Sequence, residues 1–262
     1  MKLSAAAPSL LAAIVLPYLV VSVNGLGFSE LASEVSFPGG VCPVLPANRA
    51  PVFSTPPLAN DGWVIVNFCG TGCENHYNDD GSASQDLSFA FDMFGSSFSK
   101  TYINTNGNIS FRKGLTSFSA EGFPLVGSNG DVSLVAPFWA DVDIGNDVDS
   151  DLGHIWMKAI SLNVLAVAWD YVGYYNKSGD KRNTFMVMIS DGLDPSMGVG
   201  NNVCFCYEDM EWTTGDVSGT SGFGGYPATA GVNKGTENLY MVFGQYNGKC
   251  YKSHVNSIIQ VY

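Results

Sequence analysis

Short apolar stretches alternate with polar, glycine-rich stretches over most of this chain. The apolar stretches are rich in Val, Ile, Phe, Trp and Tyr, and none carries a stripe at helical spacing over a dozen residues. This pattern predicts strands rather than helices. The expected strands cover residues 63–68, 87–91, 101–103, 109–111, 132–136, 153–158, 164–171, 184–190, 203–207, 229–232 and 239–243. We therefore predict an all-β fold, an antiparallel β-sandwich or a barrel-like domain, preceded by an extended N-terminal arm.

Two hairpins are predicted from the residues that separate neighbouring strands. Asn106 and Gly107 lie between two apolar stretches, and Asn-Gly tolerates positive φ at both central positions of a tight turn. A second hairpin is expected to join residues 164–171 to residues 184–190 through the polar loop 176–182.

Residues 1–25 have the pattern of a secretory signal peptide. No charged residue occurs between Leu3 and Val23, and small residues surround a cleavage position after Gly25. The alternative is a retained membrane anchor, but Pro8 and Pro17 would interrupt its helix and no Lys or Arg cluster follows it. We predict cleavage, secretion to the extracellular space and no transmembrane span in the mature chain.

The remaining sequence divides into an arm and a domain. Residues 26–60 hold six prolines with little periodicity, which predicts an extended Pro-rich arm. Residues 61–262 are assigned to one β domain. Without residues 1–25 the chain has 11 basic and 24 acidic residues, a formal charge of −13. This charge disfavours nucleic acid as a partner and permits cations, including calcium.

Cysteine usage is consistent with an oxidising compartment. The chain has six cysteines, an even number, so disulfides are expected. The residues concerned are Cys42, Cys69, Cys73, Cys204, Cys206 and Cys250. Cys204 and Cys206 would lie on the same face of one strand, where a bond between them is disfavoured. A zinc site at Cys69, Cys73 and His76 is the alternative, but it would lack a fourth ligand.

An acidic segment is the candidate metal site. Five carboxylates occur within eleven residues, namely Asp141, Asp143, Asp147, Asp149 and Asp151. Oxygen ligands at this density suit calcium, which is therefore the candidate cofactor. The segment is not an EF-hand loop, because Leu152 and Lys158 stand where glycine and glutamate are needed. The alternative is a solvated acidic turn.

Two sequons predict N-glycosylation. The sequon at Asn176 falls in the polar loop of the second hairpin, where an attached glycan would be solvated. The sequon at Asn108 directly follows the Asn106-Gly107 turn.

Five sequence blocks resemble, in order, the signature of the nidogen-like (NIDO) domain family. They are INTNGNISF at 103–111, APFWADVD at 136–143, NTF at 183–185 leading to SDG at 190–192, MEWTTGD at 210–216 and GGYPATAGVN at 224–233. The resemblance covers about residues 89–246. It implies an extracellular protein of basement membranes, gels or cell surfaces, whose partners are matrix or cell-surface proteins or glycans. It implies cell-matrix adhesion or matrix assembly, and no catalytic residues.

Two other functions remain open from the residues. Carbohydrate binding is suggested by the aromatic content, with Tyr171, Tyr174 and Tyr175 beside the polar loop as candidate contacts. A secreted glycoside hydrolase would need two carboxylates from distant strands, which one sequence does not reveal. No Gly-x-Ser-x-Gly nucleophile motif is present.

Overall fold

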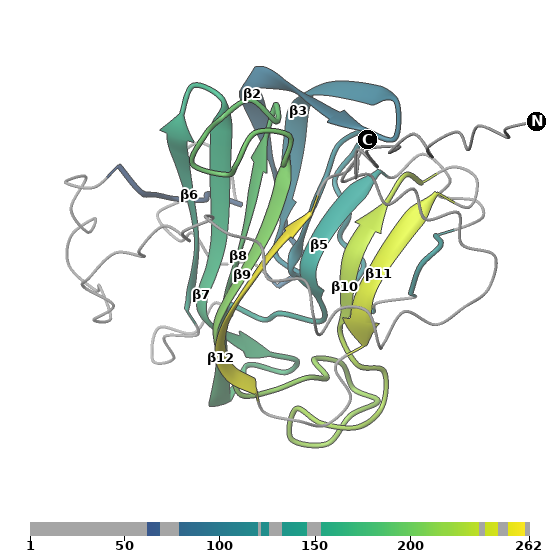
Figure 1. Cartoon of the computed structure of the whole chain (residues 1–262). Coiled ribbons are helices and arrows are strands. Elements are labelled where there is room, and N and C mark those ends of the chain that lie inside the picture. Colours follow the sequence, from purple (N-terminus) through teal and green to yellow (C-terminus); the bar gives the residue numbers. More distant parts are fainter. Residues whose placement is uncertain are drawn as a thin grey trace, which may run out of the picture.

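The described residues form two antiparallel β-sheets that pack face to face (Figure 1). The computed structural model describes residues 62–68, 79–119, 122–125, 133–145, 153–235, 239–245 and 251–259. In spatial order the first sheet consists of β1 (Val64–Ile65), β6 (His154–Ser161), β7 (Val164–Tyr174), β8 (Ser178–Ser190), β9 (Val203–Met210) and β12 (Tyr251–Ile259). The second consists of β11 (Tyr240–Gln245), β10 (Thr229–Asn233), β5 (Leu134–Trp139), β4 (Asn108–Ser110), β3 (Ser96–Asn104) and β2 (Ser82–Met93).

The main hydrophobic core lies between the two sheets. In β7, Val167 and Trp169 point into it, and Ala166 and Ala168 pack on the opposite face of the same strand. Trp169 also links the sheets, because its indole Nε1 donates to the carbonyl of Thr105 at 2.9 Å. Alternate side chains of a strand point to opposite faces, so two facing sheets produce this division. The all-β prediction is confirmed in its sandwich form, since the described strands form two separate sheets rather than a closed barrel.

Both faces of the central strands of the first sheet are buried. Ala166, Met186, Met188 and Cys204 form part of a second apolar cluster on the outer face. This explains why residues 164–171 and 184–190 read as nearly continuous apolar stretches rather than as alternating ones.

Both predicted hairpins are present, but both have a different turn from the one predicted. Ile103 pairs with Ile109 and Asn104 with Asn108, which leaves a three-residue loop at 105–107. Only Gly107 in that loop has positive φ, at 71°. In the second hairpin Tyr174 pairs with Ser178, so the loop is residues 175–177 rather than the predicted 176–182. Asn176 and Lys177 both adopt positive φ.

The predicted signal peptide and Pro-rich arm, residues 1–60, lie outside the described residues, and both stay predictions. Within the described part of the chain, no helix has the length and apolar character to cross a bilayer.

Candidate cation site

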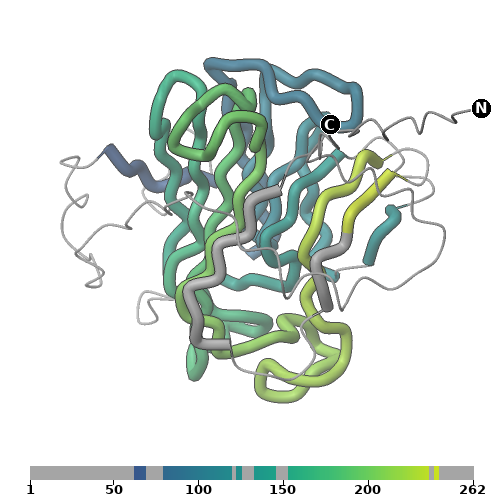
Figure 2. The backbone as a smooth tube through the Cα atoms, in the orientation of Figure 1, coloured from purple at the N-terminus to yellow at the C-terminus, as the bar shows by residue number. Residues whose placement is uncertain are grey.

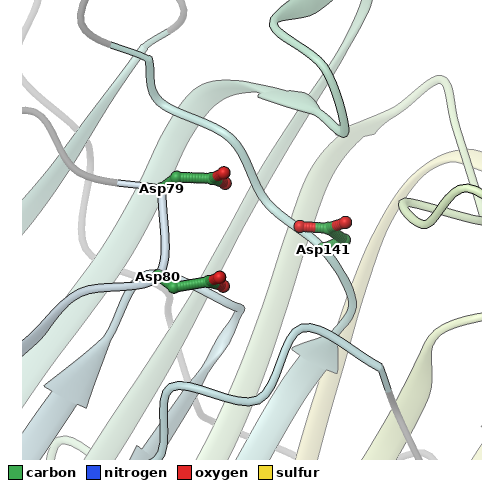
Figure 3. A group of neighbouring side chains, drawn as sticks. All are labelled: Asp79, Asp80 and Asp141. Atoms are coloured by element: carbon green, nitrogen blue, oxygen red, sulfur yellow. The ribbon is translucent and has the colours of Figure 1, made fainter.

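Three carboxylates from two distant segments meet at one end of the second sheet (Figure 3). Asp79 and Asp80 directly precede β2, and Asp141 follows β5. One oxygen from each of the three lies within 4.8 Å of the others. In Figure 3 the side chains of Asp79 and Asp80 extend side by side toward the loop that carries Asp141.

The turn between β3 and β4 holds the two acidic segments together. The Asn106 side chain donates from Nδ2 to Asp80 Oδ1 at 2.7 Å, and its Oδ1 accepts from the backbone N–H of Val142 at 3.0 Å. Thr105 adds two bonds to the first segment, because its Oγ1 accepts from Gly81 N at 2.8 Å and its N–H donates to Gly81 O at 3.0 Å. A local turn therefore fixes the distance between carboxylates that are far apart in sequence.

Glycine is required at position 107 for the same arrangement. A Cβ at this position would lie 1.8 Å from the carbonyl oxygen of Phe138, three residues before Asp141. The contact brings the β3–β4 turn against the end of β5. Gly215 allows a similar approach on the other side, where a Cβ would lie 2.6 Å from the backbone oxygen of Asp141.

Asp141 is the buried member of the cluster. Its exposed fraction is 4%, and no hydrogen-bond donor of the described residues contacts its carboxylate. Burial raises the pKa of Asp141 to about 8, and nearby carboxylates add to the shift, in decreasing order Asp79, Asp80, Asp143 and Asp216. Partial loss of contact with water also raises the pKa of Asp79 to about 6, although the residue is exposed overall, with smaller contributions from Asp143 and Asp80 and an opposing one from Lys177. The site is therefore short of positive charge.

Asp143 has a different environment from Asp141, although both were predicted as ligands. Asp143 is buried, and its Oδ1 accepts from Gly145 N at 2.7 Å. Its Oδ2 accepts from Lys177 N in the β7–β8 turn, also at 2.7 Å. Both oxygens thus already hold backbone N–H groups, and the structure does not group Asp143 with the three clustered carboxylates. Its geometry is that of an acceptor that fixes the second hairpin at this end of the sandwich.

The other predicted ligands, Asp147, Asp149 and Asp151, lie outside the described residues and stay predictions. Sequence reasoning missed Asp79 and Asp80. Two adjacent carboxylates before a glycine and an alternating strand were a weak local signal, and nothing in the sequence connected them to Asp141.

The loop that follows β9 lies at the same end of the molecule. Figure 2 shows this loop, residues 211–228, beside the β7–β8 turn at the lower end of the sandwich. Tyr175 N donates to Gly215 O at 3.0 Å, and the Tyr174 ring lies 5.5 Å from that of Trp212. Tyr174 is buried and its hydroxyl donates to Asp180, whereas Tyr171 and Tyr175 are exposed. Of the three tyrosines suggested for glycan contact, two are therefore accessible.

The structure corrects one disulfide assignment. Cys204 is a free thiol with an exposed fraction of 1%, and burial raises its pKa to about 12. Its Sγ lies 3.9 Å from Cys206 Sγ, far longer than the ~2.05 Å of a disulfide. The two do not bond each other, as expected from their spacing, and Cys206 is disulfide-bonded. Cys42, Cys69, Cys73 and Cys250 lie outside the described residues.

The two sequons have opposite environments. Asn108 has an exposed fraction of 0%, and its amide donates to Asn106 O at 3.2 Å while accepting from Asn104 Nδ2 at 2.8 Å. No glycan fits at this position in the folded domain, so the prediction for Asn108 is withdrawn. Asn176 is exposed in the β7–β8 turn and stays a predicted glycosylation site.

The fold and the acidic cluster define a β-sandwich domain with a potential cation site at one end. The profile of the family described as NIDO related matches residues 65–256, and the chain belongs to this family. Its sequence is similar to α-tectorin from Gallus gallus, with 33% identity over 192 residues, which is 63% of this chain and 9% of that protein. Human α-tectorin is 32% identical over 182 residues, 60% of this chain and 8% of that protein.

A more distant similarity links the chain to nidogen from Drosophila melanogaster, with 25% identity over 151 residues. That alignment covers 48% of this chain and 10% of nidogen, so the matched segment spans about a tenth of each of these relatives. No solved structure gives a significant match.

Proposed function

We propose that this chain is a secreted, non-catalytic module of the extracellular matrix that acts in cell-matrix adhesion or matrix assembly. The observation that carries the proposal is membership of the NIDO related family, together with the similarity to α-tectorin over 192 residues. The predicted signal peptide and the acidic composition agree with an extracellular location. Its partners would be matrix or cell-surface proteins or glycans.

Features of the described residues support a binding role over a catalytic one. The buried thiol of Cys204, with its pKa raised to about 12, is unsuited to act as a nucleophile. One oxygen of each clustered carboxylate lies within 4.8 Å of the others. Such crowding suits a shared cation better than a sugar ring between an acid and a base.

The test follows the secreted chain in culture. Cells expressing the tagged full-length sequence are extracted with detergent, and the chain is quantified in the medium and in the insoluble matrix. We expect several-fold enrichment in the matrix fraction over a tagged, unrelated β-sandwich secreted with the same signal peptide. Equal partitioning of the two proteins would contradict the proposal.

Two further measurements separate the alternatives. Selective binding to a glycan array, lost in a Tyr171→Ala and Tyr175→Ala double variant, would favour the carbohydrate-binding function. Release of reducing sugar from matrix polysaccharides by the purified chain would favour the glycosidase.

A further inference from the structure

We propose that Asp79, Asp80 and Asp141 form a calcium site that ties the start of β2 to the end of β5. The proposal is independent of the adhesion function. Its three ligands come from two segments, Asp79 with Asp80 and Asp141, and Asp79 and Asp141 lie 62 positions apart in the sequence.

The first reason is electrostatic. Three carboxylates held within 4.8 Å repel one another when ionised, and burial of Asp141 prevents water from screening that repulsion fully. The turn at 105–107 holds Asp80 toward Asp141 through Asn106, so the segments cannot simply separate to relieve the repulsion. A divalent cation among the three oxygens converts the repulsion into attraction.

The second reason is the state of Asp141 itself. It is more than nine-tenths buried, and its carboxylate accepts no hydrogen bond from the described residues. Buried carboxylates are normally satisfied by donors or by a metal. Its neighbour Asp143 shows the usual solution, with a backbone donor on each oxygen. Asp141 instead faces the other two carboxylates, where a metal ion would complete its interactions (Figure 3).

The ligand chemistry selects calcium. The donors are carboxylate oxygens, which hard cations prefer, and no described sulfur or imidazole belongs to the group. Asp79 and Asp80 are exposed, so water can supply the remaining ligands. Calcium tolerates six to eight oxygen ligands in irregular geometry, whereas magnesium requires a near-octahedral shell. For an exposed extracellular site we expect a Kd of about 10⁻⁴ to 10⁻³ M.

The side chain of Lys177 is a positive charge near the site that would compete with calcium. It lowers the pKa of Asp79. Its backbone N–H is held by Asp143, which keeps the residue at this end of the sandwich. One exposed ammonium cannot balance three carboxylates. The Lys177→Gln variant should therefore bind calcium several-fold more tightly than the wild type, since a like charge near the ion is removed.

The experiment is a thermal melt of the secreted full-length chain in calcium and in chelator at matched ionic strength. We expect calcium to raise the wild-type Tm by several degrees, and magnesium to raise it much less. Asp141→Asn should abolish the shift, because it removes the buried carboxylate ligand. It should also raise the Tm in chelator, because burying an ionisable carboxyl among other carboxylates is unfavourable. Asp79→Asn with Asp80→Asn should abolish the shift as well.

Two control variants make the result specific. Asp92→Asn removes an exposed carboxylate of β2 that lies outside the cluster, and it should retain the full calcium shift. The Asp147→Asn, Asp149→Asn and Asp151→Asn triple variant should also retain it. The proposal is overturned by equal wild-type melting temperatures in calcium and chelator, by a shift that survives Asp141→Asn, or by loss of the shift in the triple variant. None of these outcomes would alter the matrix-retention test of the proposed function.

Discussion

Replacing Asn183 by leucine should destabilise the domain strongly, because this side chain satisfies the backbone where β9 leaves the sheet. Asn183 is fully buried, and its Oδ1 accepts from Glu211 N at 2.8 Å and Trp212 N at 3.1 Å. Its Nδ2 donates to Trp212 O at 3.0 Å. Leucine has a similar size but can make none of these bonds.

The expected loss in free energy of unfolding follows from the backbone groups that Asn183 no longer bonds. The N–H of Glu211 keeps a second acceptor, the carbonyl of Arg182 at 3.2 Å, so this group stays hydrogen-bonded after the substitution. The N–H and C=O of Trp212 lose the Asn183 partner, and an unsatisfied buried polar group costs about 1–3 kcal/mol. We therefore expect Asn183→Leu to lower the free energy of unfolding by about 2–6 kcal/mol, a large part of the roughly 5–15 kcal/mol typical of a domain.

Urea unfolding followed by tryptophan fluorescence measures this loss, because Trp212 and Trp169 are both fully buried. The midpoint should fall with little change in the slope m. Asn163→Leu in the β6–β7 turn is the matched control, and its effect should stay within about 0.5 kcal/mol. A loss below about 1 kcal/mol for Asn183→Leu would show that the Trp212 backbone finds other partners, and the hydrogen-bond reasoning would be refuted.

Three further predictions concern the turns and the thiol. Gly107→Ala should cost at least about 2 kcal/mol more than Gly95→Ala in urea unfolding, because both have positive φ but only Gly107 faces a carbonyl, at 1.8 Å. Equal losses would refute the close-contact account. Cys204 should resist iodoacetamide at pH 8 in the native protein and react in denaturant, as mapped by differential alkylation; native labelling would contradict its burial. Asn176 should carry a glycan removable by an amidase, detected as a mass shift abolished by Asn176→Gln, and an unshifted wild type would count against it.

The sequence alone predicted the second hairpin and the strands of the sandwich, because the patterns that indicate strands and turns lie within short stretches of the chain. Residues 164–171 and 184–190 are long apolar stretches, and β7 and β8 form where they were expected. The first hairpin was placed correctly, but its turn type was not. Asn106 does not use positive φ, because the loop has three residues and only the last of them, Gly107, adopts the left-handed conformation. The last strand, β12, was missed although residues 251–259 pair with β9 over most of its length.

The candidate cation site required the tertiary structure. The sequence placed Asp141 at a strand end and suggested ligands close to it in the chain. Spacing along the chain does not report which strand ends meet, and the partners Asp79 and Asp80 reach Asp141 through the pairing of β2, β3, β4 and β5. The same limit applies to Asn108 and Cys204, because the sequence does not show whether a sequon or a cysteine is exposed or buried. Composition and alternation determined which residues form strands, whereas the packing of strands far apart in sequence decided which polar groups are buried together.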